Sequence, residues 1–361
     1  MTGDLSASPP DWDLFCHVVD NFGDVGVCWR LAADLGARGQ RVRLWLDDAS
    51  ALRWMAPHGA RGVEVRPWDE ATEAVAPADI VVEAFGCDPP AGFVAGMAAR
   101  RPAPVWINLE YLSAEAWVER SHGLPSPQQS GPARGLSKWF FFPGFTAATG
   151  GVLREPGLLA RSALFDRSAW LAGIGAQPRP GERVVTVFAY PARGLEARLR
   201  TALGSTPALL LAAPGRAQAQ VVAAAGGPLR AKVLDWLPQT SFDEFLWSSD
   251  LAFVRGEDSF VRAQWAGCPF VWQIYPQHDG AHAAKLDAFL DRFLAGADAP
   301  LRAAVRRVWH GWNGLGPMPH AADWPDRAAW GAHALAWRDR LAAQADLTSQ
   351  LMGFAEAKRS R

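Results

Sequence analysis

Carboxylates lie where the sequence predicts that a strand gives way to a helix. Asp20 and Asp24 follow the apolar run from Asp13 to Val19 and precede a helical pattern. In a doubly wound sheet this is the edge at which ligands bind, so these groups are placed to orient a cation or to accept a proton. They can equally cap the helix by accepting hydrogen bonds from its free N–H groups, and both interpretations stay open. With only Gly23 and Gly26, the turn lacks G-x-G-x-x-G, and its negative charge disfavours a pyrophosphate.

A second acidic group begins another predicted helix. Glu257, Asp258 and Ser259 follow the strand pattern that ends at Arg255. The N-terminus of a helix binds phosphate through its backbone N–H groups. Arg255 and Arg262 can add charge-assisted contacts to a diphosphate, although ordinary ion pairs explain them equally well.

Two patterns suggest metal ligands, and neither is convincing. Asp11 and Asp13 form a D-x-D pair, but they precede the first strand, which is the wrong place for a diphosphate-bound metal. His278 and His282 have a spacing that suits zinc on a helix, but Gly280 weakens that helix and no third ligand is evident. We therefore expect no metal or other cofactor.

The candidate residues are embedded in alternating strand-like and helix-like runs, which predict an α/β protein with parallel sheets. The length of 361 residues suits two domains, which we place at 11–177 and 178–345, followed by a tail at 346–361 whose last residues, AEAKRSR, are expected to fray. Residues 121–151 are rich in Ser, Pro and Gly before the aromatic run KWFFFPGF, which suggests a long functional loop with an anchoring plug. The Trp-rich segment 301–340 predicts helices that cover the second sheet.

Charge and hydropathy exclude several classes of partner. The formal net charge of -1 provides no field to hold a polyanion, so we expect no nucleic-acid partner. The sequence has no signal-peptide pattern and no apolar run long enough to span a bilayer, which predicts a cytoplasmic protein without a membrane partner.

Four long segments resemble the elongation factor P arginine rhamnosyltransferases. They are VVDNFGDVGVCWRLAADL, INLEYLSAEAWVERSHGLPSPQ, KWFFFPGFTAATGG and VRGEDSFVRAQWAGCPFVWQIYPQHDGAH. The resemblance implies a GT-B architecture, in which two facing Rossmann-like domains enclose an interdomain cleft. It also implies metal-independent, inverting transfer of L-rhamnose from dTDP-β-L-rhamnose to an arginine of translation elongation factor P, which relieves ribosome stalling at polyproline. The acceptor is expected to bind the N-terminal domain through the folded N-terminal domain of elongation factor P, and the nucleotide sugar the C-terminal domain.

The resemblance also assigns roles to residues. The implied catalytic residues are Asp20, Asp24 and Glu257. The implied donor contacts are Tyr190, Gln239, Phe242, Arg255, Asp258 and Ser259. The implied acceptor-side residues are Asn21, Phe22 and Gly23. Two alternatives are another nucleotide-sugar enzyme on the same fold, either an epimerase or a transferase, and a non-catalytic binding partner of a translation factor.

Overall fold

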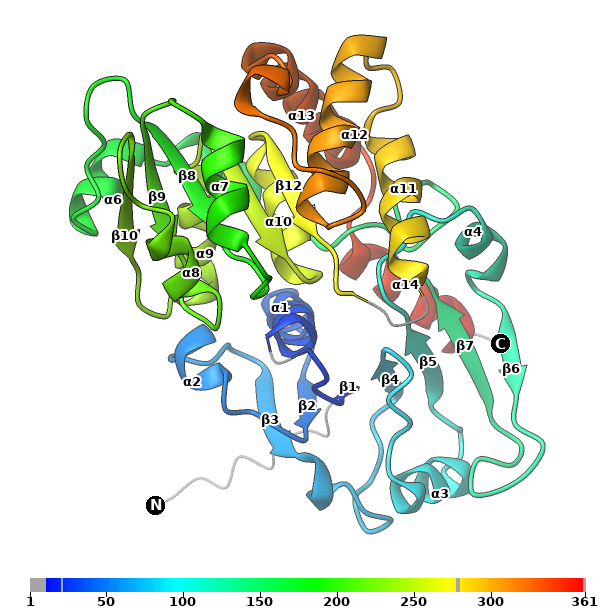
Figure 1. Ribbon diagram of the computed structural model, residues 1–361. Coiled ribbons are helices and arrows are strands. Elements are labelled where there is room, and N and C mark those ends of the chain that lie inside the picture. Colours follow the sequence, from blue (N-terminus) through cyan, green and yellow to red (C-terminus); the bar gives the residue numbers. More distant parts are fainter. Residues whose placement is uncertain (1–10, 21, 277–279, 360–361) are drawn as a thin grey trace, which may run out of the picture. The chain divides into compact units, whose positions relative to one another are not determined.

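The protein is represented by a computed structural model that describes residues 11–20, 22–276 and 280–359 (Figure 1). It divides into two compact units. Unit 1 comprises the described residues of Met1–Glu155 and Ala345–Arg361, and unit 2 comprises those of Pro156–Gln344. The division at Glu155 falls earlier than the predicted boundary after residue 177.

The described residues of unit 1 form a seven-stranded sheet with the order β3-β2-β1-β4-β5-β7-β6. Its strands are β1 (Trp12–Cys16), β2 (Val42–Leu46), β3 (Val63–Pro67), β4 (Ile80–Ala84), β5 (Val105–Leu109), β6 (Pro125–Pro127) and β7 (Ser137–Phe141). All neighbours are parallel except β6 and β7, which pair antiparallel. Every residue of β1, β4 and β5 is buried, as expected for parallel strands covered on both faces.

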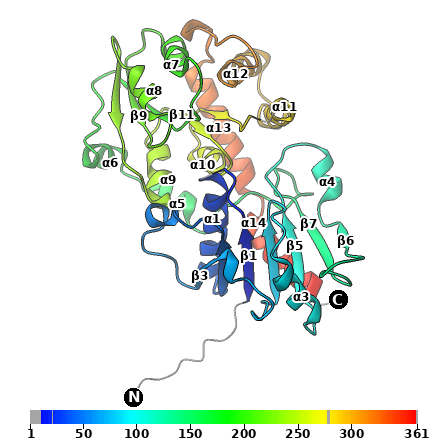
Figure 2. The same ribbon diagram turned by 60° about the horizontal axis from the view of Figure 1, so that its bottom comes forward.

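Helices cover both faces of this sheet (Figures 1 and 2). Helices α1 (Gly23–Ala37) and α14 (Leu347–Arg359) share one apolar core with β1, β2, β4 and β5. Helix α3 (Ala91–Ala99) packs on the opposite face, where Phe93 and Met97 contact the other side of the strands. The shorter elements are α2 (Leu52–Met55), a 3-10 turn (Trp68–Glu70) and α4 (Trp117–Ser121).

The predicted tail is instead a helix, because Leu347–Arg359 form α14 and complete the core of unit 1. The expected fraying of the last residues is wrong for 355–359, which belong to this helix, and 360–361 lie outside the described residues. Leu347, Leu351 and Ala355 are buried at four-residue intervals. Polar contacts fasten the ends of this helix, with Asp346 paired to Arg38 at 2.8 Å. An apolar stripe at this spacing is the signature of a packed helix rather than a tail.

The aromatic run predicted to plug a long loop is instead strand β7, paired in parallel with β5. Trp139 and Phe141 contribute to the core shared with α1 and α14. The prediction of a loop over 121–151 is therefore wrong at residues 125–127 and 137–141, which form β6 and β7. A run of aromatic residues fits a pleated, half-buried surface, and burial against β5 gives this run its strand conformation.

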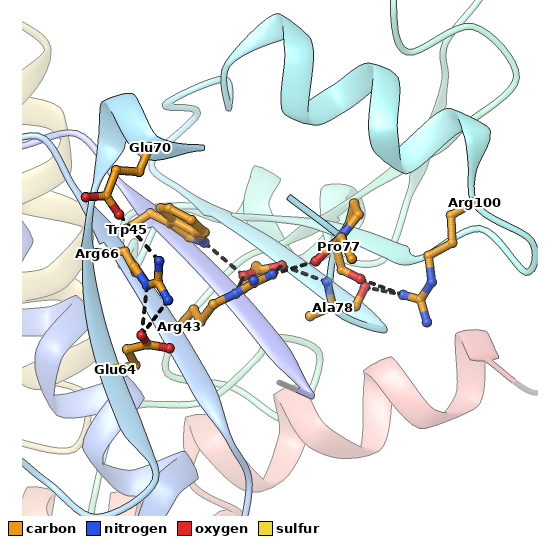
Figure 3. Close-up of polar contacts among 10 residues, drawn as sticks. Arg43, Trp45, Glu64, Arg66, Glu70, Pro77, Ala78 and Arg100 are labelled. Atoms are coloured by element: carbon orange, nitrogen blue, oxygen red, sulfur yellow. Dashed lines mark hydrogen bonds and ion pairs between the residues drawn. The ribbon is translucent and has the colours of Figure 1, made fainter. Parts of the chain in front are cut away.

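Asp13 organises polar contacts within the sheet of unit 1. Its carboxylate accepts hydrogen bonds from Arg43 (2.7 and 2.8 Å), from the indole N–H of Trp45 (2.8 Å) and from the backbone N–H of Ala78 (2.7 Å) (Figure 3). Asp13 is fully buried, so these partners supply what water would otherwise give. Asp13 therefore serves the fold, joining β1 to β2 and to the segment that precedes β4.

The described residues of unit 2 form a five-stranded parallel sheet with the order β10-β9-β8-β11-β12. Its strands are β8 (Arg183–Val187), β9 (Ala208–Ala212), β10 (Leu229–Val233), β11 (Leu251–Arg255) and β12 (Phe270–Gln273). Its helices are α5 (Leu158–Ala163), α6 (Arg167–Gly173), α7 (Leu195–Leu203), α8 (Gln218–Ala223), α9 (Gln239–Trp247), α10 (Asp258–Ala266), α11 (Ala281–Phe293), α12 (Ala299–Trp312) and α13 (Arg327–Ala342), with a 3-10 turn at Ala321–Asp323.

The Trp-rich segment forms helices, as predicted. Trp309 of α12 stacks against Phe289 of α11, with ring centroids 5.6 Å apart, and Trp337 of α13 meets the edge of the same ring at 5.8 Å. This aromatic cluster also includes Phe270 of β12, so it joins the three helices to the sheet. Across the described residues, no helix combines the length and the apolar character needed to cross a bilayer.

Candidate active site

The strand order brings the acidic turn of unit 1 to a topological switch point. Strands β1 and β4 are neighbours, yet the chain goes from β1 to β2 on one side and from β4 to β5 on the other. Loops diverge where such strands end, and the crevice between them is the usual ligand site of open α/β sheets. Residues 17–20 and 22–24 follow β1, and Phe85 follows β4.

Asp24 is buried in the first turn of α1, and its carboxylate is held on both oxygens. Oδ2 accepts hydrogen bonds from the backbone N–H groups of Val19 (2.9 Å) and Asp20 (2.8 Å). Oδ1 accepts one from the hydroxyl of Tyr111 at 3.3 Å. Both backbone donors precede α1, so these two bonds shape the turn and do not satisfy the free N–H groups of the helix. The capping interpretation does not account for them.

Burial raises the pKa of Asp24 above its ordinary value of 3.8, and the neighbouring charge of Asp20 raises it further. The bonds from Asp20, Val19 and Tyr111 lower the pKa but do not offset the loss of solvent. A carboxylate in this environment is more basic than one in water, which suits a proton acceptor or the partner of a single cation.

The other predicted residues of this turn have different surroundings. Asp20 is partly exposed, and its Oδ2 would lie 2.7 Å from a Cβ placed on Gly23. The absence of a side chain at Gly23 therefore lets Asp20 lie against the start of α1. Phe22 packs edge-on against Trp54 at 5.4 Å. Asn21 lies outside the described residues.

Two aromatic residues at this edge of the sheet, Phe85 and Tyr111, were not predicted. Tyr111 follows β5 and stacks on Phe85 with ring centroids 4.1 Å apart and an interplanar angle of 9°. Tyr111 lies within the segment INLEYLSAE, near the end of a predicted strand, and the ends of parallel strands are where ligand-binding residues are expected.

The switch point of unit 2 lies between β8 and β11, and it holds Arg255 between two rings. The guanidinium carbon lies 4.6 Å from the centroids of both Phe188 and Tyr190. Arg255 is largely buried, and a guanidinium fixed by its faces presents its N–H groups in one plane, the geometry that binds phosphate oxygens.

Further aromatic residues extend this cluster. Phe242 of α9 meets Phe188 edge-on at 5.5 Å, so the structure brings the predicted Tyr190, Phe242 and Arg255 together. Gln273 accepts a hydrogen bond from the backbone N–H of Tyr190 at 2.7 Å, and Tyr275 meets the Tyr190 ring edge-on at 5.5 Å. Phe188, Gln273 and Tyr275 were not predicted, although each lies at or just beyond the end of a strand.

The start of α10 carries the remaining predicted residues of unit 2. Glu257 precedes the helix, Asp258 is its first residue, and both are partly exposed. Ser259 is buried and donates its hydroxyl to the carbonyl oxygen of Arg255. It also accepts from the backbone N–H of Arg255 at 3.2 Å. Ser259 therefore shapes the turn that carries Arg255.

Arg262 lies away from this ligand edge. Its guanidinium donates two 2.8 Å hydrogen bonds to the carboxylate of Asp243, and both side chains are buried. Of the two interpretations of Arg262, the ion pair is the one observed. The pair ties α10 to α9, the helix on which Gln239 is buried one turn before Phe242.

The residues of the two metal patterns have other surroundings. Asp11 pairs with Arg41 at 2.8 Å, and Asp13 is enclosed by the partners described above. His278 lies outside the described residues. No group of three or more His, Cys, Asp or Glu residues able to hold a metal occurs in the described ranges.

The chain is similar to one family of known proteins over nearly its whole length. Residues 12–356 match the model of a family described as elongation factor P (EF-P) rhamnosyltransferase EarP. The protein-arginine rhamnosyltransferase of Pseudomonas putida is 46% identical over 95% of this chain and 98% of its own length. The one from Pseudomonas aeruginosa is 42% identical, with the same two coverages.

Solved structures give the same fold. A structure described as the structural basis for EarP-mediated arginine glycosylation of translation elongation factor EF-P matches with a TM-score of 0.67 and 33% identity, covering 97% of this chain and 99% of that one. MurG of Acinetobacter baumannii matches with a TM-score of 0.52 and 14% identity over 96% and 99%, which supports the fold alone. The predicted GT-B fold class is confirmed.

Proposed function

Because this chain belongs to the EarP family of elongation factor P (EF-P) rhamnosyltransferases and is therefore a protein-arginine rhamnosyltransferase, we propose that it transfers L-rhamnose from dTDP-β-L-rhamnose to an arginine of EF-P with inversion. The observation that carries the proposal is the carboxylate of Asp24 at the switch point of unit 1, which is buried and accepts hydrogen bonds from two backbone N–H groups. An enzyme that acts on a translation factor works where translation occurs, so we also propose a cytoplasmic location.

The acceptor presents a chemical difficulty that Asp24 can resolve. A guanidinium stays protonated far above neutral pH and is then a poor nucleophile. In our proposal Asp24 pairs with the guanidinium, orients one nitrogen toward the anomeric carbon and takes its proton as the C–N bond forms. Asp20, at the same turn, supplies a second carboxylate, which balances the cation before the proton leaves.

The donor binds unit 2 in this proposal. Thymine lies against the aromatic surface of Tyr190 and Phe242, where ring stacking gives affinity. The diphosphate lies at Arg255 and at the N-terminus of α10, which stabilise the negative charge that develops as the bond between C1 and the diphosphate oxygen breaks. Glu257 and Asp258, partly exposed beside this helix start, accept hydrogen bonds from hydroxyl groups of the sugar.

In this scheme the charges and the proton balance without a metal. The electron pair of the broken C1–O bond leaves with dTDP, the guanidine nitrogen bonds to C1 from the opposite face, and the proton released goes to Asp24. Arg255 and the helix N-terminus take the role that a divalent cation has in other sugar transferases. We therefore propose that no metal cofactor is needed.

Intact-mass analysis tests the proposal most directly. EF-P incubated with the enzyme and dTDP-β-L-rhamnose should gain one deoxyhexose, also in the presence of EDTA, and EF-P lacking the acceptor arginine should gain none. NMR of the product should give the α-anomer expected from inversion. Conversion of the donor without any gain of mass by EF-P would point to an epimerase or another transferase. A β-linked product would contradict inversion.

A further inference from the structure

The ends of three neighbouring strands meet beside Asp24. The order β1-β4-β5 places the described residues of the turn after β1, then Phe85, then Tyr111 at successive positions along one edge of the sheet. Tyr111 comes from the third of these strands, yet its hydroxyl reaches the carboxylate that follows the first. The residue from the intervening strand, Phe85, lies against the Tyr111 ring.

Phe85 is held in this place by an unusual backbone. Its φ of 60° lies in the left-handed region, where a bulky residue is uncommon. Its N–H donates to the carbonyl of Leu109 at 2.7 Å, and the next residue, Gly86, donates to the buried side chain of Asn108 at 3.1 Å. The chain therefore keeps a disfavoured conformation while the Phe85 ring supports Tyr111, a combination often found at functional sites.

We propose that Tyr111 is a positioning residue for the general base Asp24 and that Phe85 is the support that holds its ring. The consequence for catalysis rests on the function proposed above. Since Oδ2 is occupied by two backbone N–H groups, Oδ1 is the oxygen on which an acceptor cation and Tyr111 must both act. The Tyr111 hydroxyl fixes the direction of that oxygen. Tyr111 is 41% exposed, so its own position depends on the stack with Phe85.

The protonation of Asp24 should respond to this contact. The titratable groups of the described residues that act on Asp24 or are affected by its charge include Asp20, Tyr111 and the buried Cys28. Burial and Asp20 raise the pKa of Asp24, whereas the Tyr111 hydroxyl lowers it. Removing the hydroxyl should therefore raise the pKa further and leave less of the carboxylate ionised at mildly acidic pH.

The test compares Tyr111→Phe, Tyr111→Leu and Phe85→Leu with the parent enzyme, using two independent measurements. The first is the pH profile of kcat/KM for EF-P, whose acid limb should move to higher pH in Tyr111→Phe. On the acid side of the profile, kcat/KM should fall roughly twofold to tenfold relative to the parent enzyme. At high pH the loss should largely vanish. Tyr111→Leu and Phe85→Leu should show the same displacement, and Leu164→Ala, an exposed site on unit 2, should show none.

The second measurement is the titration of Asp24 by carboxyl ¹³C NMR without donor or acceptor. The Asp24 signal should titrate at higher pH in Tyr111→Phe than in the parent protein. An acid limb and an Asp24 titration that both stay in place would overturn the positioning role, even if EF-P is rhamnosylated normally. If the titration moves but EF-P is never modified, the positioning role stands and the proposed function fails.

Discussion

At the scale of single residues, the charge on Asp24 that we propose for catalysis is unfavourable for the stability of the fold. The pKa of Asp24 is raised in the folded protein, so ionisation of the carboxylate is less favourable there than in the unfolded chain. The ionised carboxylate therefore lowers the free energy of unfolding. This destabilisation is present above the raised pKa and disappears as the pH falls below the ordinary value of 3.8. Acidification through this window should therefore favour the fold at this residue while it protonates the carboxylate that we propose as the proton acceptor.

We predict that Asp24→Asn lowers single-turnover transfer by about 10²- to 10⁴-fold, the range of a general base. The amide preserves the shape and can still accept from Val19 and Asp20. The melting temperature at neutral pH should stay the same or rise, because a desolvated charge has been removed. Rapid single-turnover transfer by this variant would reduce Asp24 to a residue that shapes the turn.

Arg255 permits a second prediction at this scale. Arg255→Ala should weaken dTDP binding by about tenfold or more, since a charge-assisted hydrogen bond contributes about 1.5–3 kcal/mol. Arg255→Lys should restore little of the dTDP affinity, because a compact ammonium cannot fill the place of a planar group between Phe188 and Tyr190. Calorimetric titration measures both, with Arg307→Ala on the exposed face of α12 as the control. Unchanged affinity in Arg255→Ala would remove Arg255 from the donor site.

At the scale of elements, α14 gives unit 1 much of its core. Leu351 is fully buried in it. We predict that Leu351→Ala lowers the free energy of unfolding of unit 1 by about 2–5 kcal/mol, the usual effect of removing a buried leucine side chain. Two residues later, Gly353 is exposed and has open space where a Cβ would be. Gly353→Ala should therefore stabilise the helix by about 0.5–1 kcal/mol.

Denaturant unfolding followed by a probe in unit 1 measures both changes. If Leu351→Ala and Gly353→Ala leave the unfolding midpoint equally unaffected, α14 contributes little to the stability of unit 1. That result would contradict the role inferred from its buried stripe.

The sequence predicted the alternating strands and helices because parallel strands are continuous apolar runs separated by helical patterns, as in β4 and β9. It failed at β7 and α14, because their identity depends on what they pack against. The aromatic run needed β5 beside it, and Leu347 and Leu351 needed a core whose residues outside α14 lie between Trp12 and Leu153, far earlier in the chain.

The candidate site was predictable in part for the same reason. Asp24 lies in the first turn of the helix that follows β1, and Arg255 ends β11, and the sequence carries both strand-to-helix transitions as a local signal. Tyr111 became recognisable only from the strand order, which brings the end of β5 near the end of β1. The commitment of Arg262 to Asp243 likewise depends on the contact between α9 and α10, which no local pattern reports.

At the scale of the whole molecule, the net charge of -1 gives no strong nonspecific attraction to any partner. Recognition of EF-P must then come from shape as well as from the single arginine. We predict that kcat/KM for the folded acceptor domain exceeds that for a linear peptide around the same arginine, because a flexible peptide loses conformational entropy on binding and offers less surface. Equal values would mean that the enzyme reads only the local sequence.

The return of α14 to unit 1 also determines the order in which the nascent chain can complete its two cores. All of Pro156–Gln344 is synthesised before Leu347–Arg359, so unit 2 has its full sequence while unit 1 still lacks a helix. Domains usually fold from the N-terminus onward during translation. Here unit 1, which begins first, can be completed only after the codons for α14 are read. A ribosome that stops early would thus release a chain whose N-terminal half exposes an uncovered apolar face.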